Sequence, residues 1–195
     1  MSQSDYIDAS TGIHNRNFLE EQSTEIILYQ KFKKQSFSLI LADIDCCKIQ
    51  NDLYGYKAVD FRIQKIAHII ANCVHVSKID HVLVRWAGDQ FLLVLLNTDE
   101  NEAVTIVKLI QNQIYHLGII WDKSAVLEVI MRMSLPDFNN ISDRVSLSYG
   151  ITTIEPELNK SWESCLKRLD QAMSQAKLAG RNCYVVWNDE KTVKS

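Results

Sequence analysis

The segment Arg85-Trp86-Ala87-Gly88-Asp89-Gln90-Phe91 decides the fold that this sequence predicts. It joins two apolar runs, Val82–Val84 and Phe91–Leu96, each as long as a buried strand. Gly88 and Asp89 favour tight turns, so the two runs are predicted to form a β-hairpin. A carboxylate at the tip of this hairpin either shapes the turn or faces a ligand, and turn chemistry alone does not distinguish these two roles.

Length and composition indicate one ordinary globular domain. A chain of 195 residues, 47% hydrophobic and 23% charged, can bury one α/β core and is too short to argue for two. The net charge of -3 provides no basic footprint for nucleic acid. The five cysteines lack zinc-site spacing, so we expect reduced, mostly buried thiols.

No apolar run in the sequence is long enough to span a membrane, and the N-terminus lacks the apolar centre of a signal peptide. We therefore expect no membrane segment and no nucleic-acid partner. The expected location is the cytoplasm, either as a separate protein or as the cytoplasmic portion of a larger one.

The spacing of apolar residues predicts the remaining secondary structure. Helices are predicted at residues 16–34, 57–75, 100–117 and 161–179, the last closed by Gly180. Strands are predicted at residues 37–44, 145–152 and 183–187, in addition to those of the hairpin. A turn is predicted at Asn51–Tyr56. Residues 118–144 are the hardest to interpret: Val126–Met133 is compatible with a strand, and Pro136–Asp143 with a polar loop.

This order of elements predicts an α/β (α+β) fold with a central, mostly antiparallel sheet flanked by helices. Two helices on one face of the sheet would satisfy the order, as in ferredoxin-like or nucleotidyl-cyclase palm folds. We expect a single domain at residues 8–187, preceded by a lead-in at 1–7 and followed by a polar tail at 188–195.

Two carboxylates, Asp43 and Asp45, stand at the end of the strand predicted at 37–44, and strand alternation places them on one face. Ligands of α/β folds gather at such strand ends. If Asp43 and Asp89 meet there, a bridging Mg²⁺ would relieve their repulsion. Alternatively, Asp43 and Asp45 cap the next helix and Asp89 only shapes a turn. Spacing alone favours this simpler alternative.

Five motifs shift that judgement. They read DASTGIHNRN at 8–17, DIDCCKIQNDLYGYKAVD at 43–60, RWAGDQF at 85–91, SYG at 148–150 and LDQAMSQAKLAGRN at 169–182. In order and spacing they resemble DxLTGLxNRR, DIDxFKxxNDxYGHxxGD, RYGGDEF, SxG and ADxALYxAKxxGRN of the GGDEF (diguanylate cyclase) family. Any one motif would be weak evidence, but five in the correct order are specific.

The resemblance implies that the protein handles GTP. The family joins two GTP molecules into cyclic di-GMP across a homodimer, with one GTP held by each subunit. By position, the ligands of Mg²⁺ or Mn²⁺ would be Asp43, Asp89 and the carbonyl of Ile44. The guanine would be read by Asn51 and Asp60, and the triphosphate would be held by Lys48, Lys177 and Arg181. Alternatively, Lys177 and Arg181 only oppose the dipole at the end of a helix.

The signature departs from the family pattern at two positions. Ala87 replaces the first Gly, which matters only if that residue needs a positive φ or close substrate approach. Gln90 replaces a Glu, and an amide neither acts as a general base at neutral pH nor adds charge to a cation site. Loss of a general base typically costs about 10² to 10⁴ in rate. The expected catalytic set is thus Asp43, Asp89 and an impaired Gln90.

We therefore expect a degenerate domain of cyclic di-GMP signalling that binds GTP with Mg²⁺ and has weak or no turnover. The first alternative is an active diguanylate cyclase that condenses two GTP into cyclic di-GMP and pyrophosphate. The second is a protein-interaction domain without nucleotide. The expected partners are GTP and a second GGDEF chain, in a homodimer or a heterodimer.

Overall fold

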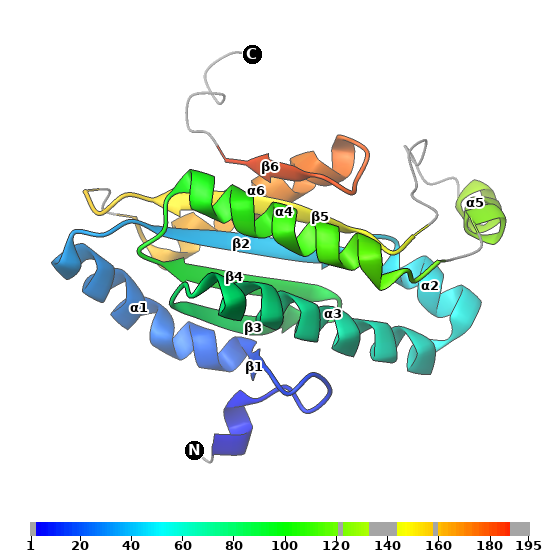
Figure 1. Ribbon diagram of the computed structural model, residues 1–195, viewed down its shortest axis with the longest axis horizontal. Helices are drawn as coiled ribbons and strands as arrows, with labels where there is room; N and C mark the ends of the chain where they lie inside the picture. The colour runs from blue at the N-terminus through cyan, green and yellow to red at the C-terminus, as the bar shows by residue number, and fades with distance from the viewer. Residues whose placement is uncertain (1–2, 121–122, 133–143, 158–159, 188–195) are drawn as a thin grey trace.

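Six strands form one sheet in the order β1-β3-β4-β2-β5-β6 (Figure 1). The computed structural model describes residues 3–120, 123–132, 144–157 and 160–187. The strands are β1 (His14–Asn15), β2 (Phe37–Ile44), β3 (His81–Ala87), β4 (Gln90–Leu96), β5 (Leu147–Ile154) and β6 (Tyr184–Val186). The three inner pairings are antiparallel, whereas β1 and β6 lie parallel to their neighbours at the two edges. The predicted mostly antiparallel sheet is confirmed.

The predicted hairpin is formed by β3 and β4. The register shifts between Arg85 and Ala87, so a bulge precedes the turn at Gly88 and Asp89. Ala87 has no positive φ, so its extra methyl group is tolerated by the backbone. On its other edge β4 pairs with β2, and Gln90 lies directly opposite Asp43.

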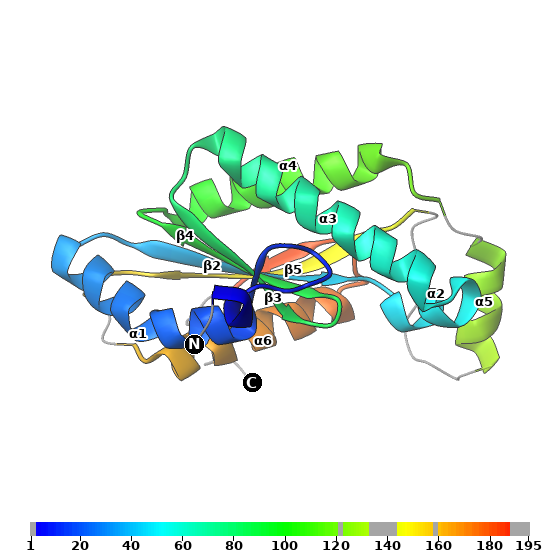
Figure 2. The same ribbon diagram turned by 90° about the horizontal axis from the view of Figure 1, so that it is seen from below.

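Helices cover both faces of the sheet (Figure 2). The helices are α1 (Arg16–Lys33), α3 (Tyr56–Ser77), α4 (Glu100–Leu117) and α6 (Trp162–Leu178). One core joins α3 and α4 to the side of β2 that carries Ile40 and Ala42. The other joins α1 and α6 to the side that carries Leu39 and Leu41. The predicted sheet flanked by helices is confirmed. Two helices on one face would have satisfied the order of elements, but β2 is buried on both faces and a pair of helices covers each.

Two short helices replace elements that the sequence suggested. The predicted turn at 51–56 is largely occupied by α2 (Cys47–Tyr54). Its C-terminal capping residue, Gly55, has a φ of 78°. The strand considered at 126–133 is the helix α5 (Lys123–Arg132). Because short apolar runs of β-branched residues suit either structure, periodicity did not separate them. Met133 and the loop at Pro136–Asp143 lie outside the described residues.

The other predicted helices are confirmed to within about two residues, and a side-chain cap begins three of them, α1, α4 and α6. Asp99 accepts a hydrogen bond from the Glu102 amide while the Glu102 side chain accepts one from the Asp99 amide, which forms a capping box at α4. A short 3₁₀ helix, η1 (Gln3–Tyr6), precedes the sheet. Because α3 begins at Tyr56, Asp60 lies beyond its first turn.

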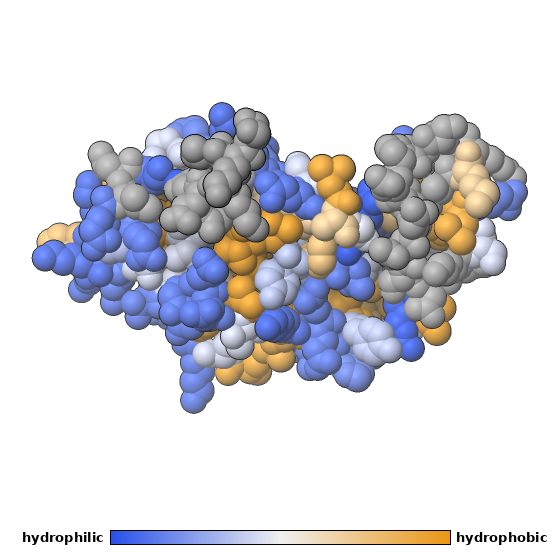
Figure 3. Space-filling model, turned by 90° about the horizontal axis from the view of Figure 1, so that it is seen from above, coloured by the Kyte–Doolittle hydropathy of each residue, from blue (hydrophilic) through white to orange (hydrophobic). Residues whose placement is uncertain are grey.

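The surface and the cysteines are consistent with a globular domain. On the face seen in Figure 3, hydrophilic side chains surround smaller apolar areas. Among the described helices, none combines the length and the apolar character needed to cross a bilayer. All five cysteines are free, and three of them are buried.

Gly150 of β5 allows α6 to approach the sheet closely. A Cβ atom at this position would lie 2.6 Å from the Leu169 carbonyl oxygen and 2.7 Å from the Met173 nitrogen. Both atoms belong to the helix backbone, so they cannot rotate away. The SxG motif therefore has a packing role at this position.

We expect Gly150→Ala to lower the free energy of unfolding by about 1–3 kcal/mol, because it overpacks the contact between β5 and α6. Urea denaturation measures this change. Gly88→Ala is the matched control, since no atom lies within 4 Å of a Cβ there and its φ is not positive. Equal stabilities for the two variants would contradict the packing role.

Candidate functional site

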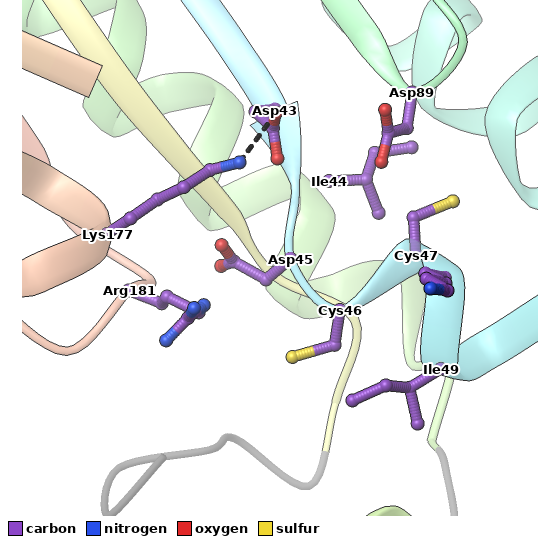
Figure 4. A pocket seen from close by; sticks show the side chains of 10 residues that line it. Asp43, Ile44, Asp45, Cys46, Cys47, Ile49, Asp89, Lys177 and Arg181 are labelled. Carbon is purple, nitrogen blue, oxygen red and sulfur yellow. Dashed lines mark ion pairs between the residues drawn. The ribbon is translucent and has the colours of Figure 1, made fainter. Parts of the chain in front are cut away.

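The candidate site lies where β2 ends beside the turn between β3 and β4 (Figure 4). A pocket of about 250 Å³ opens there. Its wall includes six of the predicted residues, namely Asp43, Ile44, Lys48, Asp89, Lys177 and Arg181. They come from β2, α2, the hairpin turn, α6 and the loop after α6, so the fold brings together side chains that are far apart in the sequence.

Asp43 is the most constrained side chain of this pocket. It is only 5% exposed, and its Oδ2 atom lies 2.8 Å from the Nζ atom of Lys177. The Nε2 atom of Gln90 donates a hydrogen bond of 2.8 Å to the same oxygen. One carboxylate oxygen therefore carries both a salt bridge and an amide hydrogen bond.

Asp89 sits in the hairpin turn, on the opposite side of the pocket from Lys177 in Figure 4. Its carbonyl accepts a hydrogen bond of 3.1 Å from the Ile44 amide, which fixes the turn against β2. Burial, followed by the charge of Asp43, raises the pKa of the Asp89 carboxyl. The charge of Asp43 thus disfavours the ionised form of Asp89.

The donor set fits a hard divalent cation. Carboxylate and carbonyl oxygens are the ligands that Mg²⁺ prefers, and it is commonly held by one or two carboxylates plus substrate phosphates. Among the described residues, no three His, Cys, Asp or Glu side chains form a ready-made metal cluster. Asp43, Asp89 and the Ile44 carbonyl would hold such an ion, with phosphate oxygens completing its coordination.

A second pocket of about 350 Å³ adjoins the first. Asn51 and Asp60, the predicted guanine readers, line it together with Tyr56. Lys48 and Asp89 line both pockets. The predicted guanine-binding residues Asn51 and Asp60 therefore line one pocket, and the predicted phosphate-binding residues Lys177 and Arg181 line the other. The two pockets are neighbours because they share Lys48 and Asp89.

Cys47 also lines both pockets, at a position where the family pattern has Phe. Burial, followed by the charge of Asp89, raises its pKa to about 12. The thiol is therefore protonated at neutral pH and acts as a small packing residue.

The simpler interpretation of Asp43 and Asp45 as helix caps is contradicted by the structure. The residue that caps α2 is Cys46, and no side-chain hydrogen bond caps that helix. Neither Asp43 nor Asp45 therefore acts as a helix cap. Lys177 lies in the last turn of α6, yet its ammonium group is paired with Asp43 across the pocket.

Asp45 has a structural role that the sequence did not reveal. Its buried carboxylate accepts hydrogen bonds from Ser146 Oγ at 2.7 Å and Ser148 Oγ at 2.6 Å. It also accepts one of 3.1 Å from the backbone N–H of Asn182. Arg181 and Asn182 both have positive φ, 64° and 49°, which is uncommon for residues other than glycine. Asp45 therefore holds the strained loop that presents Arg181.

The motif at 8–17 supports the hairpin from outside the site. Arg85 donates hydrogen bonds to the Gly88 carbonyl from Nε at 2.9 Å and Nη2 at 2.7 Å. Its Nη1 atom lies 3.2 Å from Asp8 Oδ1, which also accepts from the Thr11 amide and hydroxyl. Asp8 thus orients the arginine that fixes the turn carrying Asp89.

The fold and this site define a palm-type domain in which two acidic side chains, Asp43 and Asp89, and three basic ones share a single pocket. The sequence model described as diguanylate cyclase, GGDEF domain, matches residues 5–183. The chain therefore belongs to the GGDEF family of diguanylate cyclase domains in cyclic di-GMP signalling.

Individual relatives agree with this assignment. Diguanylate cyclase A of Treponema denticola is 25% identical over an alignment 194 residues long. The alignment covers 89% of this chain and 47% of that protein. Diguanylate cyclase DgcS of Shewanella oneidensis is 27% identical over 184 residues, with 94% and 53% covered. The chain thus spans about half the length of these curated relatives.

Solved structures share the fold. The GGDEF domain of DgcB from Caulobacter crescentus, solved in complex with c-di-GMP, has a TM-score of 0.77 at 18% identity, with 97% of each chain covered. The active GGEEF domain of a diguanylate cyclase from Vibrio cholerae has a TM-score of 0.71 at 21% identity, with 90% of this chain and 97% of that one covered.

We expect Asp45→Ala to lower the free energy of unfolding by at least about 2 kcal/mol, because three donors lose a buried acceptor. Urea denaturation at neutral pH measures the change. Asp170→Ala, which removes an exposed carboxylate of α6, is the control and should change stability little. A loss no larger than that of the control would show that Asp45 does not hold the loop.

The Asp8–Arg85 contact should make stability depend on pH. Partial burial of Asp8 opposes its ionisation, but hydrogen bonds from Thr11 and Arg85 outweigh it and lower the pKa of this carboxyl below 3.8. A lowered folded-state pKa stabilises the fold above the ordinary value and loses that effect as pH falls through the folded value.

We therefore expect Asp8→Asn to be less stable than the wild type by about 1 kcal/mol at neutral pH. The difference should shrink as the pH falls below 3.8. Denaturant titrations across this range measure it. A difference that stays constant with pH would contradict a charge-dependent role.

Proposed function

We propose that this GGDEF domain binds GTP with a divalent cation and turns it over weakly or not at all. The observation that carries the proposal is the hydrogen bond from Gln90 to Asp43 Oδ2, set inside an otherwise complete pair of pockets.

The two pockets suit the two ends of a guanine nucleotide. Lys48, Lys177 and Arg181 give one pocket three cationic side chains, which complement a triphosphate. Asn51 offers an amide and Asp60 a carboxylate in the other pocket, which complement the acceptors and donors of guanine. Because Lys48 lines both compartments, one nucleotide can occupy them together.

Mg²⁺ or Mn²⁺ would be held by Asp43, Asp89 and the carbonyl of Ile44. When bound, such an ion would neutralise phosphate charge and polarise the reacting groups. Lys177 would then exchange Asp43 for a phosphate oxygen, because it is the half-exposed partner of that salt bridge.

Gln90 supports weak turnover for two reasons. First, an amide has no basic lone pair with which to take a proton from an attacking hydroxyl at neutral pH. Second, its N–H group donates to one of the two oxygens with which Asp43 could bind a cation, whereas an ionised Glu at this position would accept and add charge. Charge at the metal site is therefore reduced and one ligand atom is already occupied.

Joining two nucleotides would require two chains, since one chain supplies one such pair of pockets among its described residues. We therefore propose a homodimer, or a heterodimer with a second GGDEF protein. Diguanylate cyclase SiaD of Pseudomonas aeruginosa, which shares this fold with a TM-score of 0.75, was solved in complex with its activator SiaC. A separate protein partner is thus an alternative means of control.

Two other functions compete with this proposal. An active diguanylate cyclase is favoured by the complete set of metal, guanine and phosphate positions, with water or Asp89 in place of the missing base. A protein-interaction domain without nucleotide would be favoured only if the pockets proved unable to hold GTP.

We expect the wild type to bind GTP in the presence of Mg²⁺ or Mn²⁺ and to form cyclic di-GMP at least about 10²-fold more slowly than Gln90→Glu. Calorimetry measures binding and chromatography of the nucleotides measures product. Gln113→Glu, the same chemical change on the exposed surface of α4, should behave as the wild type.

Each other outcome selects one alternative. Wild-type turnover equal to that of Gln90→Glu would contradict the degenerate site and favour the active cyclase. Failure of GTP to bind to either protein would contradict the nucleotide site itself and favour the protein-interaction domain.

A further inference from the structure

Helix α2 carries Lys48 and Asn51 between the two pockets, so its position determines how both are presented. It has only eight residues, and its capping residue, Cys46, has a φ of 57° and makes no side-chain capping bond. Such a short helix is not stable by itself and depends on tertiary packing.

On its inner side, α2 is held by polar contacts. The buried Gln50 donates from Nε2 to the Asp45 carbonyl at 3.0 Å, which ties α2 to the end of β2. Arg62 of α3 donates from Nη1 to Gln50 Oε1 at 2.8 Å, and its guanidinium lies 4.5 Å from the ring centre of Tyr54. These contacts fix one side of the helix only.

On its outer side, α2 packs against α5, as Figures 1 and 2 show. Val126 of α5 is fully buried and Ile49 of α2 is 3% exposed, and together they form a small core separate from the two beside the sheet. Cys46, Leu53 and Leu127 pack around this pair.

Ile49 connects this small core to the site. The same residue lines the pocket that contains Lys177 and Arg181, and it packs on Val126. It also stands next to Lys48 and two positions before Asn51 on a single turn of helix. A change at Val126 is therefore transmitted to the pocket wall through one side chain.

We propose that α5 is a positioning element of the nucleotide site and that Val126 is its positioning residue. This inference rests on the proposed function, because the ligand whose binding it affects is GTP. Val126 touches no ligand; it acts by keeping Ile49, and with it Lys48 and Asn51, in place.

Removing two methyl groups in Val126→Ala leaves a cavity under Ile49 and loosens α2. We expect the dissociation constant for GTP to rise about three- to thirtyfold, the range seen for mutations that act on a site from a distance. Hydrogen exchange of the backbone amides in Cys47–Tyr54 should become faster, while exchange in α4 stays unchanged. Val126→Ile keeps the contact and should retain wild-type affinity.

Two controls separate positioning from general destabilisation. Val107→Ala removes the same groups from a fully buried valine of α4 and should lower stability without changing GTP affinity. Met131→Ala changes a side chain of α5 that is 75% exposed and should change neither.

Unchanged exchange in Cys47–Tyr54 or unchanged GTP affinity in Val126→Ala would overturn the inference. So would an equal loss of affinity in Val107→Ala, since the effect would then be general. If the wild type binds no GTP, the proposed function fails instead. The exchange comparison then still decides whether α5 holds α2.

Discussion

The carboxylate of Asp43, buried at the end of the central strand, is the constraint on which the rest of the site depends. Strand β2 is buried on both faces and pairs along its length with β4 and β5. The carboxylate of Asp43 at its end is therefore largely shielded from water. That charge must be compensated. Lys177 reaches it from α6, and Gln90 reaches it from the neighbouring strand. The packing of α6 on the sheet, which Gly150 permits, is therefore also what brings a cation to the site.

The same compensation explains why a nearly complete site is expected to be slow. In the described structure the two partners of Asp43 bind one of its oxygens, whereas burial and the charge of Asp43 raise the pKa of Asp89. In the proposed function, a bound triphosphate competes with Asp43 for Lys177, since both are anionic acceptors. In the proposed function Gln90 stays hydrogen-bonded to Asp43, and its amide provides no base in any orientation. In the proposed function, one side chain, Gln90, therefore separates nucleotide binding from turnover.

Much of this was predictable from the sequence, for identifiable reasons. The hairpin, β2 and the four long helices follow from periodicity and caps, and the site residues follow from motifs in a fixed order. The sequence did not predict α2 and α5, because each is short and is stabilised by the other through Ile49 and Val126. Nor did it show that Asp45 binds Ser146, Ser148 and Asn182, since these partners lie far along the chain. Local patterns predict local elements, whereas mutual support between distant segments appears only in three dimensions.

The most direct test of the account is the crystal structure of this protein with GTP and Mn²⁺, in which anomalous scattering locates the metal. We expect a manganese peak between Asp43 and Asp89, a triphosphate beside Lys48, Lys177 and Arg181, and the base beside Asn51 and Asp60. Gln90 should remain within hydrogen-bonding distance of Asp43. A metal or nucleotide bound elsewhere, or pockets that stay empty at saturating GTP, would contradict the central claim that these carboxylates form a GTP-dependent cation site.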